Sequence, residues 1–327
     1  MDTDGAAGEV QRTAMITAFL LPLSPLMPHT SGSTPNDSRF SHSLATLQEL
    51  ARDVLAYAQK QSASACEVDI SDGFGQSVTV RCGEIETIEY NRDKSIAVTV
   101  YLGQHKGQAS TSVFSSSALR ETVDAAINIA RFTAADPCAG LPDPERLAKN
   151  LHQRPDLDLC HPWLLSVDQA VEVAKRCEQA AFAVSPQISN SEGAGVSIQE
   201  GHFVSANSLG FIGGFPTSRH YLSCAVIAGS GESMQRDDWY STARDPVAIE
   251  SAETIGRIAA QRALARIGAR KIRTCKVPVV FEAPLAASLI GSFVHAVSGG
   301  SLYRKTTFLA DSLGKRVFSK RVNISER

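Results

Sequence analysis

The residues best suited to covalent chemistry are a cysteine and a histidine in succession, Cys160 and His161. A thiol deprotonated by an imidazole is a nucleophile for acyl transfer. In an extended segment flanked by prolines, neighbouring side chains point in opposite directions, so His161 is poorly placed to deprotonate Cys160. An autonomous thiol hydrolase is therefore the least favoured hypothesis. It would act without a partner, survive a chelator and be blocked by a thiol reagent.

Other polar residues give weaker signals. His202 and His220 stand on predicted strands without a partner at metal-ligand spacing, and we interpret both as structural. Carboxylates recur at residues 84, 86 and 89, where the first two share a strand face, and this favours a solvated face over an acid/base pair. Residues 237–240 (DDWY) could form a binding edge, although the sequence indicates no more than a turn.

The most unusual local string is GGSLYRKTTF at residues 299–308. Two glycines after a helix are typical of a C-cap, and an aromatic beside two cations suits a carboxylate or a peptide chain. The spacing of a phosphate-binding loop is missing. On residues alone an ordinary basic turn is slightly favoured. The candidate substrate- or partner-binding residues are Ser301, Tyr303, Arg304 and Lys305.

Composition limits the function classes. The chain has 327 residues, with 32 Lys and Arg against 34 Asp and Glu, which excludes a globally basic nucleic-acid binder. With 43% hydrophobic and 20% charged residues, it is long enough for about two domains. The seven cysteines lack regular spacing, so neither a disulfide framework nor a zinc ribbon is predicted.

Residues 1–43 form a predicted disordered leader. Its apolar run at residues 14–28 is interrupted by Pro22 and Pro25 and is shorter than the roughly 20 residues of a transmembrane helix. A signal peptide needs a basic start, whereas Asp2, Asp4 and Glu9 precede this run. We expect a cytoplasmic protein without a membrane partner.

Periodicity divides the rest of the chain into alternating helices and strands. An N-terminal α+β domain is predicted for residues 44–135, with helices from Leu44 and over 116–132 and strands at 67–70, 77–81, 84–90 and 96–102. A proline-rich linker is predicted at 136–165. A central α+β domain is predicted for 166–270, with a helix from Ser166 in a capping box with Gln169, strands over 188–240 and a helix over 248–267.

The last predicted region, residues 271–327, has a buried strand at 277–281 and an apolar helix at 285–297. Neither element can bury its faces within the remaining residues of the chain, so this region is interpreted as the start of a truncated C-terminal domain. The predicted fold class is therefore α+β: two helix-flanked, mainly antiparallel sheet domains plus the start of a third region.

Several strings, taken together, resemble the PmbA/TldE family, the partner half of the TldD–TldE peptidase system. They occur in family order and are RCGEIE (81–86), ARFTAADPCAG (130–140), DLDLCHPW (156–163), TSRH (217–220) and GGSLYRKTTFLADSLGK (299–315). Family members continue well beyond residue 327, so the resemblance implies a C-terminally truncated form.

The resemblance implies a cytoplasmic bacterial protein, grouped with metallopeptidases, that forms a heterodimer with TldD. The family is associated with microcin precursor maturation, antitoxin degradation and DNA gyrase modulation. It implies that zinc is held by TldD, in a His-Glu-x-x-x-His helix. The matching junction here, residues 281–288 (FEAPLAAS), has no histidine and offers only Glu282 and the distant His295. A zinc site needs about three protein ligands, so neither a metal nor a catalytic residue is expected in this chain.

Hypotheses of two classes remain for the function. The preferred one is a subunit without its own active site that helps to hold an unfolded peptide beside the zinc of the partner, with Arg304 and Lys305 facing substrate or partner and Tyr303 as an apolar contact. The alternatives are a non-enzymatic, gyrase-linked interaction protein and a non-functional truncated product. No direct nucleic-acid partner is expected.

Overall fold

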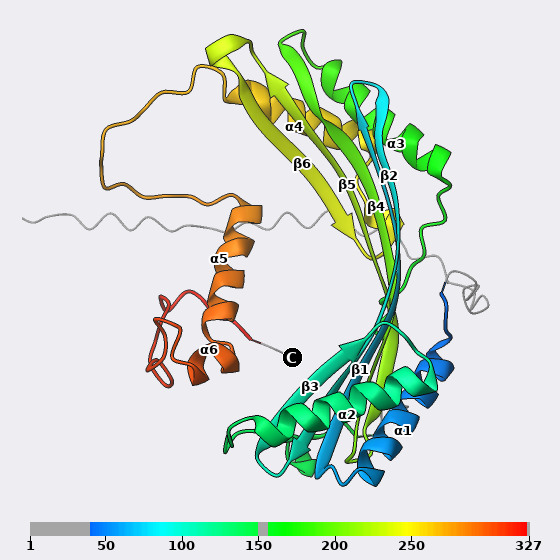
Figure 1. Ribbon diagram of the computed structural model, residues 1–327. Helices are drawn as coiled ribbons and strands as arrows, with labels where there is room; N and C mark the ends of the chain where they lie inside the picture. Colours follow the sequence, from blue (N-terminus) through cyan, green and yellow to red (C-terminus); the bar gives the residue numbers. More distant parts are fainter. Residues whose placement is uncertain (1–39, 150–155, 326–327) are drawn as a thin grey trace, which may run out of the picture. The chain divides into compact units, whose positions relative to one another are not determined.

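The computed structural model describes residues 40–149 and 156–325 (Figure 1), so nearly all of the predicted leader lies outside the described residues. The chain consists of two compact units. The first ends at Gly268 and the second begins at Ala269. Each is described by itself.

The first unit is built on one six-stranded antiparallel sheet with the strand order β3-β2-β1-β4-β5-β6. The strands are β1 (Ala65–Arg81), β2 (Glu84–Leu102), β3 (His105–Thr111), β4 (Ile188–Asn207), β5 (Ile212–Ala228) and β6 (Gln235–Ala243). The predicted α+β class with antiparallel pairing is confirmed.

The two predicted sheets are halves of this single sheet. β1 pairs with β2 along its whole length and with β4 from Glu67–Asn207 to Val80–Ala194. The predicted strands at 67–70 and 77–81 are therefore one strand, and those at 84–90 and 96–102 are another. Gly73 and Gly75 suggested turns, but pairing on both sides keeps this part of β1 extended.

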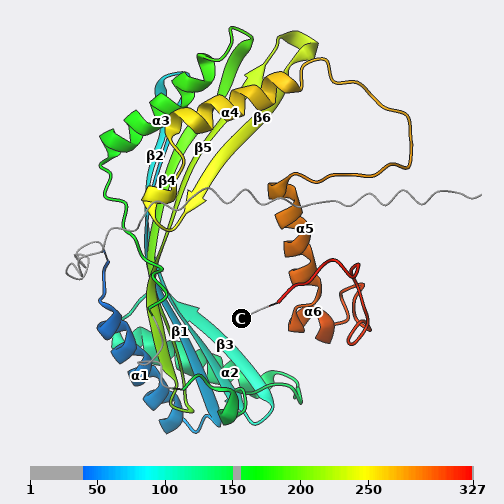
Figure 2. The ribbon, with the colours of Figure 1, turned by 180° about the vertical axis from the view of Figure 1, so that it is seen from behind.

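Two helix pairs cover opposite ends of the sheet (Figures 1 and 2). The helices α1 (Leu44–Lys60) and α2 (Ser116–Phe132) enclose one core with the first half of β1, and α3 (Val167–Phe182) and α4 (Ala252–Ala265) enclose the other. Burial on β1 alternates, with Val68, Ile70, Val78 and Val80 buried. Since these residues have the same parity, both helix pairs cover the same face.

Helix boundaries follow local capping. The predicted bounds of the helix at 116–132 and the capping box of Ser166 with Gln169 are confirmed. The helix predicted at 248–267 begins later, at Ala252, because Ser251 caps the amide of Thr254 after a short 3₁₀ turn. α4 packs closely on α3 at Gly256, where a Cβ would lie 1.9 Å from the Cys177 carbonyl oxygen.

Between the two cores, the covered face of the sheet is polar. Its buried side chains there include Asp72, Gln76, Glu200 and His202. Phe40 stacks on His202 at 3.9 Å between ring centroids, and the His42 amide donates to Asp72 Oδ2 at 2.9 Å. Non-helical segments rather than helices therefore cover this middle part.

Up to residue 325, the second unit contains two helices, α5 (Ala283–Ala296) and α6 (Gly299–Tyr303). The buried strand predicted at 277–281 is wrong: this segment is exposed and has no strand partner among the described residues. Gly299 and Gly300 begin α6 rather than ending the preceding helix. Across the described ranges, we find no helix of the length and apolar character that a bilayer span requires.

Candidate functional site

The predicted binding residues 301 and 303–305 lie on and just after α6. Ser301 is buried, and its hydroxyl oxygen lies 2.9 Å from that of Ser298. Tyr303 is 59% exposed, and Arg304 and Lys305 are exposed too. The exposed part of the predicted site is thus an aromatic ring beside two cations. Ser301 is not part of this exposed surface, because its side chain is buried and hydrogen-bonded to Ser298.

Two backbone hydrogen bonds at the end of α6 fix the conformation of the residues that carry this exposed surface. The amide of Thr306 donates to the Ser301 carbonyl at 3.0 Å, and that of Lys305 donates to the Leu302 carbonyl at 3.1 Å. These bonds form a Schellman motif, whose left-handed position glycine usually occupies. Here Lys305 occupies it with φ of 53°. Strained residues of this kind are concentrated at functional sites, and this makes Lys305 a candidate binding residue.

The side chain of Arg304 packs against Gly300, four residues earlier on α6. A Cβ on Gly300 would lie 3.2 Å from Nη1 of Arg304, so the guanidinium lies against the bare backbone of α6. Its planar donors suit a carboxylate, and a lysine beside it adds a second positive charge. The surface can therefore bind an acidic side chain or the C-terminal carboxylate of a peptide. It contains no group placed to transfer a proton to such a ligand.

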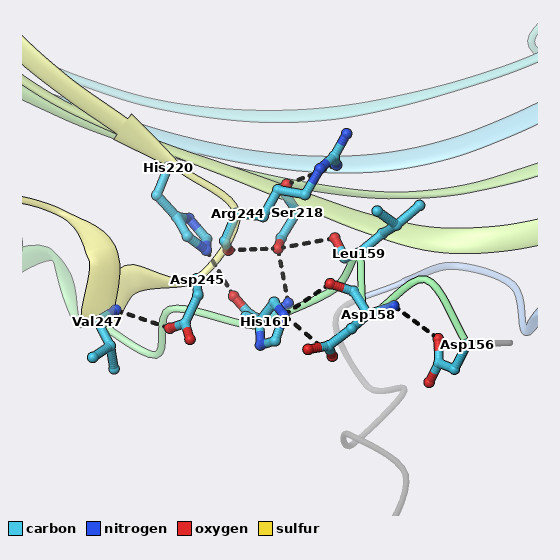
Figure 3. Close-up of polar contacts among 9 residues, drawn as sticks. All are labelled: Asp156, Asp158, Leu159, His161, Ser218, His220, Arg244, Asp245 and Val247. Carbon is cyan, nitrogen blue, oxygen red and sulfur yellow. Dashed lines mark hydrogen bonds and ion pairs between the residues drawn. The ribbon is translucent and has the colours of Figure 1, made fainter. Parts of the chain in front are cut away.

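A second polar cluster forms where the string at 156–163 crosses the sheet at 217–220 (Figure 3). Ser218, which is buried, donates to the Arg244 carbonyl at 2.9 Å and accepts from the His161 amide at 2.8 Å. The Ser218 amide also donates to the Leu159 carbonyl at 2.9 Å. The one proton of this hydroxyl is donated to a backbone carbonyl, so we assign Ser218 a structural role rather than that of a nucleophile.

The histidines of this cluster also bind backbone. His220 is fully buried, and its Nε2 lies 2.7 Å from the His161 carbonyl oxygen, with Trp163 packed edge-on at 5.5 Å. His161 Nε2 lies 3.0 Å from the Asp158 carbonyl oxygen and 3.3 Å from its carboxylate. The imidazole of His161 thus faces Asp158, as Figure 3 shows, and sequence adjacency to Cys160 has not produced a dyad.

The buried thiols are also poor nucleophiles. Burial, with a smaller effect of Glu67, raises the pKa of Cys66 to about 12. The hydrogen bond between Cys177 and Cys224, together with burial, raises the pKa of Cys177. Reactive cysteines need a depressed pKa and some exposure, and neither condition holds at these two positions.

The RCGEIE string forms the turn between β1 and β2. Cys82 and Gly83 have φ of 51° and 82°, a tight hairpin turn, and their amides donate to the carboxylate of Glu178 at 2.8 and 2.7 Å. Glu178 is buried on α3, and sequence reasoning missed its role. The available signal was its position between Ala174 and Ala181 on the apolar face of that helix.

Residues 237–240 lie within β6, inside the stretch that was predicted to form strands, and not in a turn. Asp237 contacts Arg262 at 3.1 Å and Arg266 at 3.3 Å, both at the end of α4. Burial alone would raise the pKa of this carboxyl, but the Asp238 amide and the two arginines outweigh it and lower the pKa. Asp237 therefore fastens β6 to α4. Throughout residues 40–149 and 156–325, no three His, Cys, Asp or Glu side chains gather as a metal site would require.

Comparison with known proteins gives matches along most of the described chain. The PmbA/TldA metallopeptidase domain models match in order, with domain 1 at residues 66–130, the central domain at 160–267 and the C-terminal domain at 274–327. Metalloprotease PmbA of Escherichia coli O157:H7 is 42% identical over 280 residues, covering 86% of this chain and 61% of that protein. The Haemophilus influenzae homologue is 40% identical, covering 83% of this chain and 59% of that protein.

Solved structures share the fold. A proposed modulator of DNA gyrase from Bacteroides thetaiotaomicron matches with a TM-score of 0.77 and 24% identity, covering 84% of this chain and 62% of that one. TldE from Thermococcus kodakarensis matches with a TM-score of 0.60 and 16% identity, covering 80% of this chain and 58% of that one.

This chain spans about three fifths of the length of the PmbA relatives. The matches to all three domain models follow the order of the chain, and together they cover more than half of it. The chain therefore belongs to the PmbA/TldE family.

Proposed function

We propose that this chain is the non-metal subunit of a TldD–TldE type metallopeptidase complex that cleaves unfolded peptides, with precursor and antitoxin peptides as the substrate class. The observation that carries the proposal is the 42% identity to metalloprotease PmbA together with the match to all three domain models. The fold likeness to TldE is consistent with it. In this proposal the complex is cytoplasmic.

The donor set of α5 does not fit a zinc ion. Glu282 precedes the first turn of the helix, and the single histidine, His295, lies in its last turn. Along a continuous α-helix these positions are about 20 Å apart, so they cannot bind the same ion. We therefore place zinc and water activation in a TldD-type partner, and we derive no catalytic step for this chain.

The role proposed for this chain is to bind substrate or partner through Tyr303, Arg304 and Lys305. All three side chains are exposed at the end of α6. Arginine and lysine attract carboxylates, and an exposed aromatic ring adds an apolar contact to an extended peptide. These are binding contributions, so their loss should raise KM or weaken assembly and leave the chemistry of the partner intact.

The direct test measures bound zinc and the cleavage of an unstructured peptide for this chain, for a TldD-type protein and for their mixture. We expect zinc in the TldD-type protein and cleavage that depends on adding this chain. Zinc and cleavage in this chain alone would overturn the ligand argument. If the mixture binds but no preparation cleaves, the non-enzymatic interaction hypothesis takes its place.

The binding surface is tested by the double variant Arg304→Glu with Lys305→Glu. Partner-dependent cleavage should fall about tenfold or more, because two attractive charges become repulsive. Arg316→Glu with Lys320→Glu changes the charge equally at exposed positions of the same unit and should leave cleavage unchanged. Equal activity of the two double variants would exclude residues 304 and 305 from the site.

A further inference from the structure

The string TSRH (217–220) divides between the two faces of the sheet. Ser218 and His220 point to the face that both helix pairs cover, where they are buried and hold backbone. Thr217 and Arg219 alternate with them and therefore lie on the second face, which neither helix pair covers. The structural role found for this string thus explains only half of its side chains.

Two arginines lie side by side on the second face. The pairing of His220 with Ala243 brings Arg244, the residue after β6, next to Arg219. Arg219 is exposed, and no described residue forms a hydrogen bond or an ion pair with its side chain. The guanidinium of Arg244 donates to the Thr217 hydroxyl and, at 3.2 Å, to a carbonyl of the same strand (Figure 3). Neighbouring cations of this kind repel each other unless an anion binds to them.

The carboxylates of the surrounding strands are engaged elsewhere. β4, β5 and β6 contain four of them, and Glu200 and Asp237 point to the covered face. Glu192 and Asp238 contact Arg236, at the other end of β6. Neither pair neutralises the two arginines, so this part of the second face attracts anions.

Two pairs of exposed aromatic rings lie on either side of the arginines. Phe203 of β4 and Phe215 of β5 are directly opposed, with ring centroids 6.1 Å apart. Tyr221 of β5 stacks with Tyr240 of β6 at 5.3 Å. The register puts all four rings on the second face, and they are between 37% and 46% exposed. Residues 215 and 221 are about 20 Å apart along the strand, which is the length of six residues of an extended peptide.

This arrangement favours one class of ligand. An extended peptide presents alternate side chains to one side, so two apolar residues six positions apart can contact both ring pairs while an acidic residue between them contacts the arginines. A single-stranded nucleic acid also binds rings and cations. However, its phosphates would be repelled by Asp69, Glu89 and Asp93, which are exposed on the second face of β1 and β2. The charges therefore favour an acidic peptide.

We propose that the surface formed by Phe203, Phe215, Arg219, Tyr221 and Tyr240 binds an extended peptide that has an acidic residue between two bulky apolar residues. The inference rests on the proposed function for its ligand, an unfolded peptide. It gives that ligand a sequence preference and a second place on this chain, apart from the surface at the end of α6.

The test measures peptide binding by fluorescence anisotropy with the full chain and without a TldD-type protein. The probe is a labelled nine-residue peptide of serine and threonine, with phenylalanine at its second and eighth positions and aspartate at its fourth and sixth. Arg219→Glu should raise the Kd about tenfold, because an attractive charge becomes repulsive. Phe215→Thr with Tyr221→Thr should also raise it about tenfold, because threonine suits a strand but removes the rings.

A second peptide, with lysine in place of both aspartates, tests the charge preference. It should bind the wild type about tenfold more weakly than the aspartate peptide does. It should bind Arg219→Glu more tightly than it binds the wild type, which also shows that this variant is folded. The matched controls are Arg52→Glu on the exposed side of α1 and Phe132→Thr at the end of α2, and both should leave the Kd of the aspartate peptide unchanged.

The proposal is overturned if the wild type does not bind the aspartate peptide, or if Arg219→Glu and the ring variant bind it like the wild type. It is also overturned if a thymidine oligonucleotide binds more tightly than the peptide and loses affinity in Arg219→Glu, because the surface then serves a nucleic acid. The binding assay contains no partner, so failed cleavage in the mixture would count against the proposed function and not against this surface.

Discussion

At the scale of single residues, side-chain type was a poor guide to chemistry in this protein. Ser218, His220 and Glu178 have the functional groups of a nucleophile, a base and an acid. Each of them is buried and hydrogen-bonded to backbone. Unsatisfied backbone groups are costly when buried, and these side chains satisfy such groups where irregular segments cross the sheet and at a tight turn. The strings that resemble the family therefore contain or contact residues that fix the course of the backbone rather than residues of a catalytic site.

Lys305 is different, because its conformation works against local stability. A non-glycine residue in the left-handed region costs about 1 kcal/mol, so Lys305→Gly should raise the free energy of local unfolding at the end of α6 by about that amount. The same change removes a cation from the proposed site and should lower partner-dependent cleavage. Hydrogen exchange at the amides of Lys305 and Thr306, which form the hydrogen bonds of this helix end, measures the first effect, and cleavage kinetics measure the second.

Lys305→Ala separates the two contributions in this prediction. Alanine removes the charge and keeps the strained backbone, so cleavage should fall without a gain in stability. If both variants cleave like the wild type, Lys305 has no role in binding. The left-handed conformation of Lys305 would then serve only to end α6.

Contacts of this kind could be predicted only where they were local in sequence. The capping box of Ser166 spans three residues and was predicted correctly. The bond between His161 and Ser218 spans 57 residues, and that between Cys82 and Glu178 spans 96. No periodicity encodes the partners in such pairs. The place of Glu178 on the apolar face of α3 indicated a buried carboxylate, but a single sequence could not identify the amides that it binds.

At the scale of elements, helices were predicted well because their apolar period is a local property. The strands were harder, since Gly73, Gly75 and the polar residues 91–95 interrupt the alternation that marks a strand. Pairing between β1 and β4 overrides these local signals. It joins residues more than one hundred positions apart, and so the single sheet was not predicted.

The junction of β6 and α4 predicts a dependence of stability on pH. The pKa of Asp237 is lower in the folded chain than its ordinary value of 3.8, so its contribution is complete above that value. It is lost as the pH falls through the lowered pKa. Asp237→Asn should cost about 2 kcal/mol at pH 7 and progressively less below about pH 4.

Urea denaturation of the wild type and of Asp237→Asn at pH 3, 4 and 7 measures this difference. Asp245→Asn is a matched control, because that carboxylate caps a single 3₁₀ turn and lies in none of the ion pairs at the end of α4. A difference between wild type and Asp237→Asn that stays constant from pH 7 to pH 3 would contradict the role given to the two arginines.

At the scale of the whole molecule, the two units differ in how much apolar surface they bury. The first has two clusters of buried residues against one sheet. In the described part of the second unit, the buried residues are Ala296, Ser301 and Leu309. Large apolar residues are exposed along α5 and after it, among them Leu285, Leu289, Val294, Phe308 and Leu313. Exposed apolar residues contribute little to the stability of the unit that carries them. A group of them on the surface is typical of a site that binds another protein segment.

Limited proteolysis should therefore separate the units at their connection. Residues 269–282 are exposed and lack regular structure, and Arg270, Lys271, Arg273 and Lys276 offer trypsin sites there. Arg262 lies within α4, where cleavage requires local unfolding. We expect early cuts at 270–276, late cuts at 262 and a first unit that retains its cooperative unfolding after cleavage. Because its cores involve no residue beyond 268, its urea midpoint should be unchanged, and a clear drop would show that the second unit contributes to its stability.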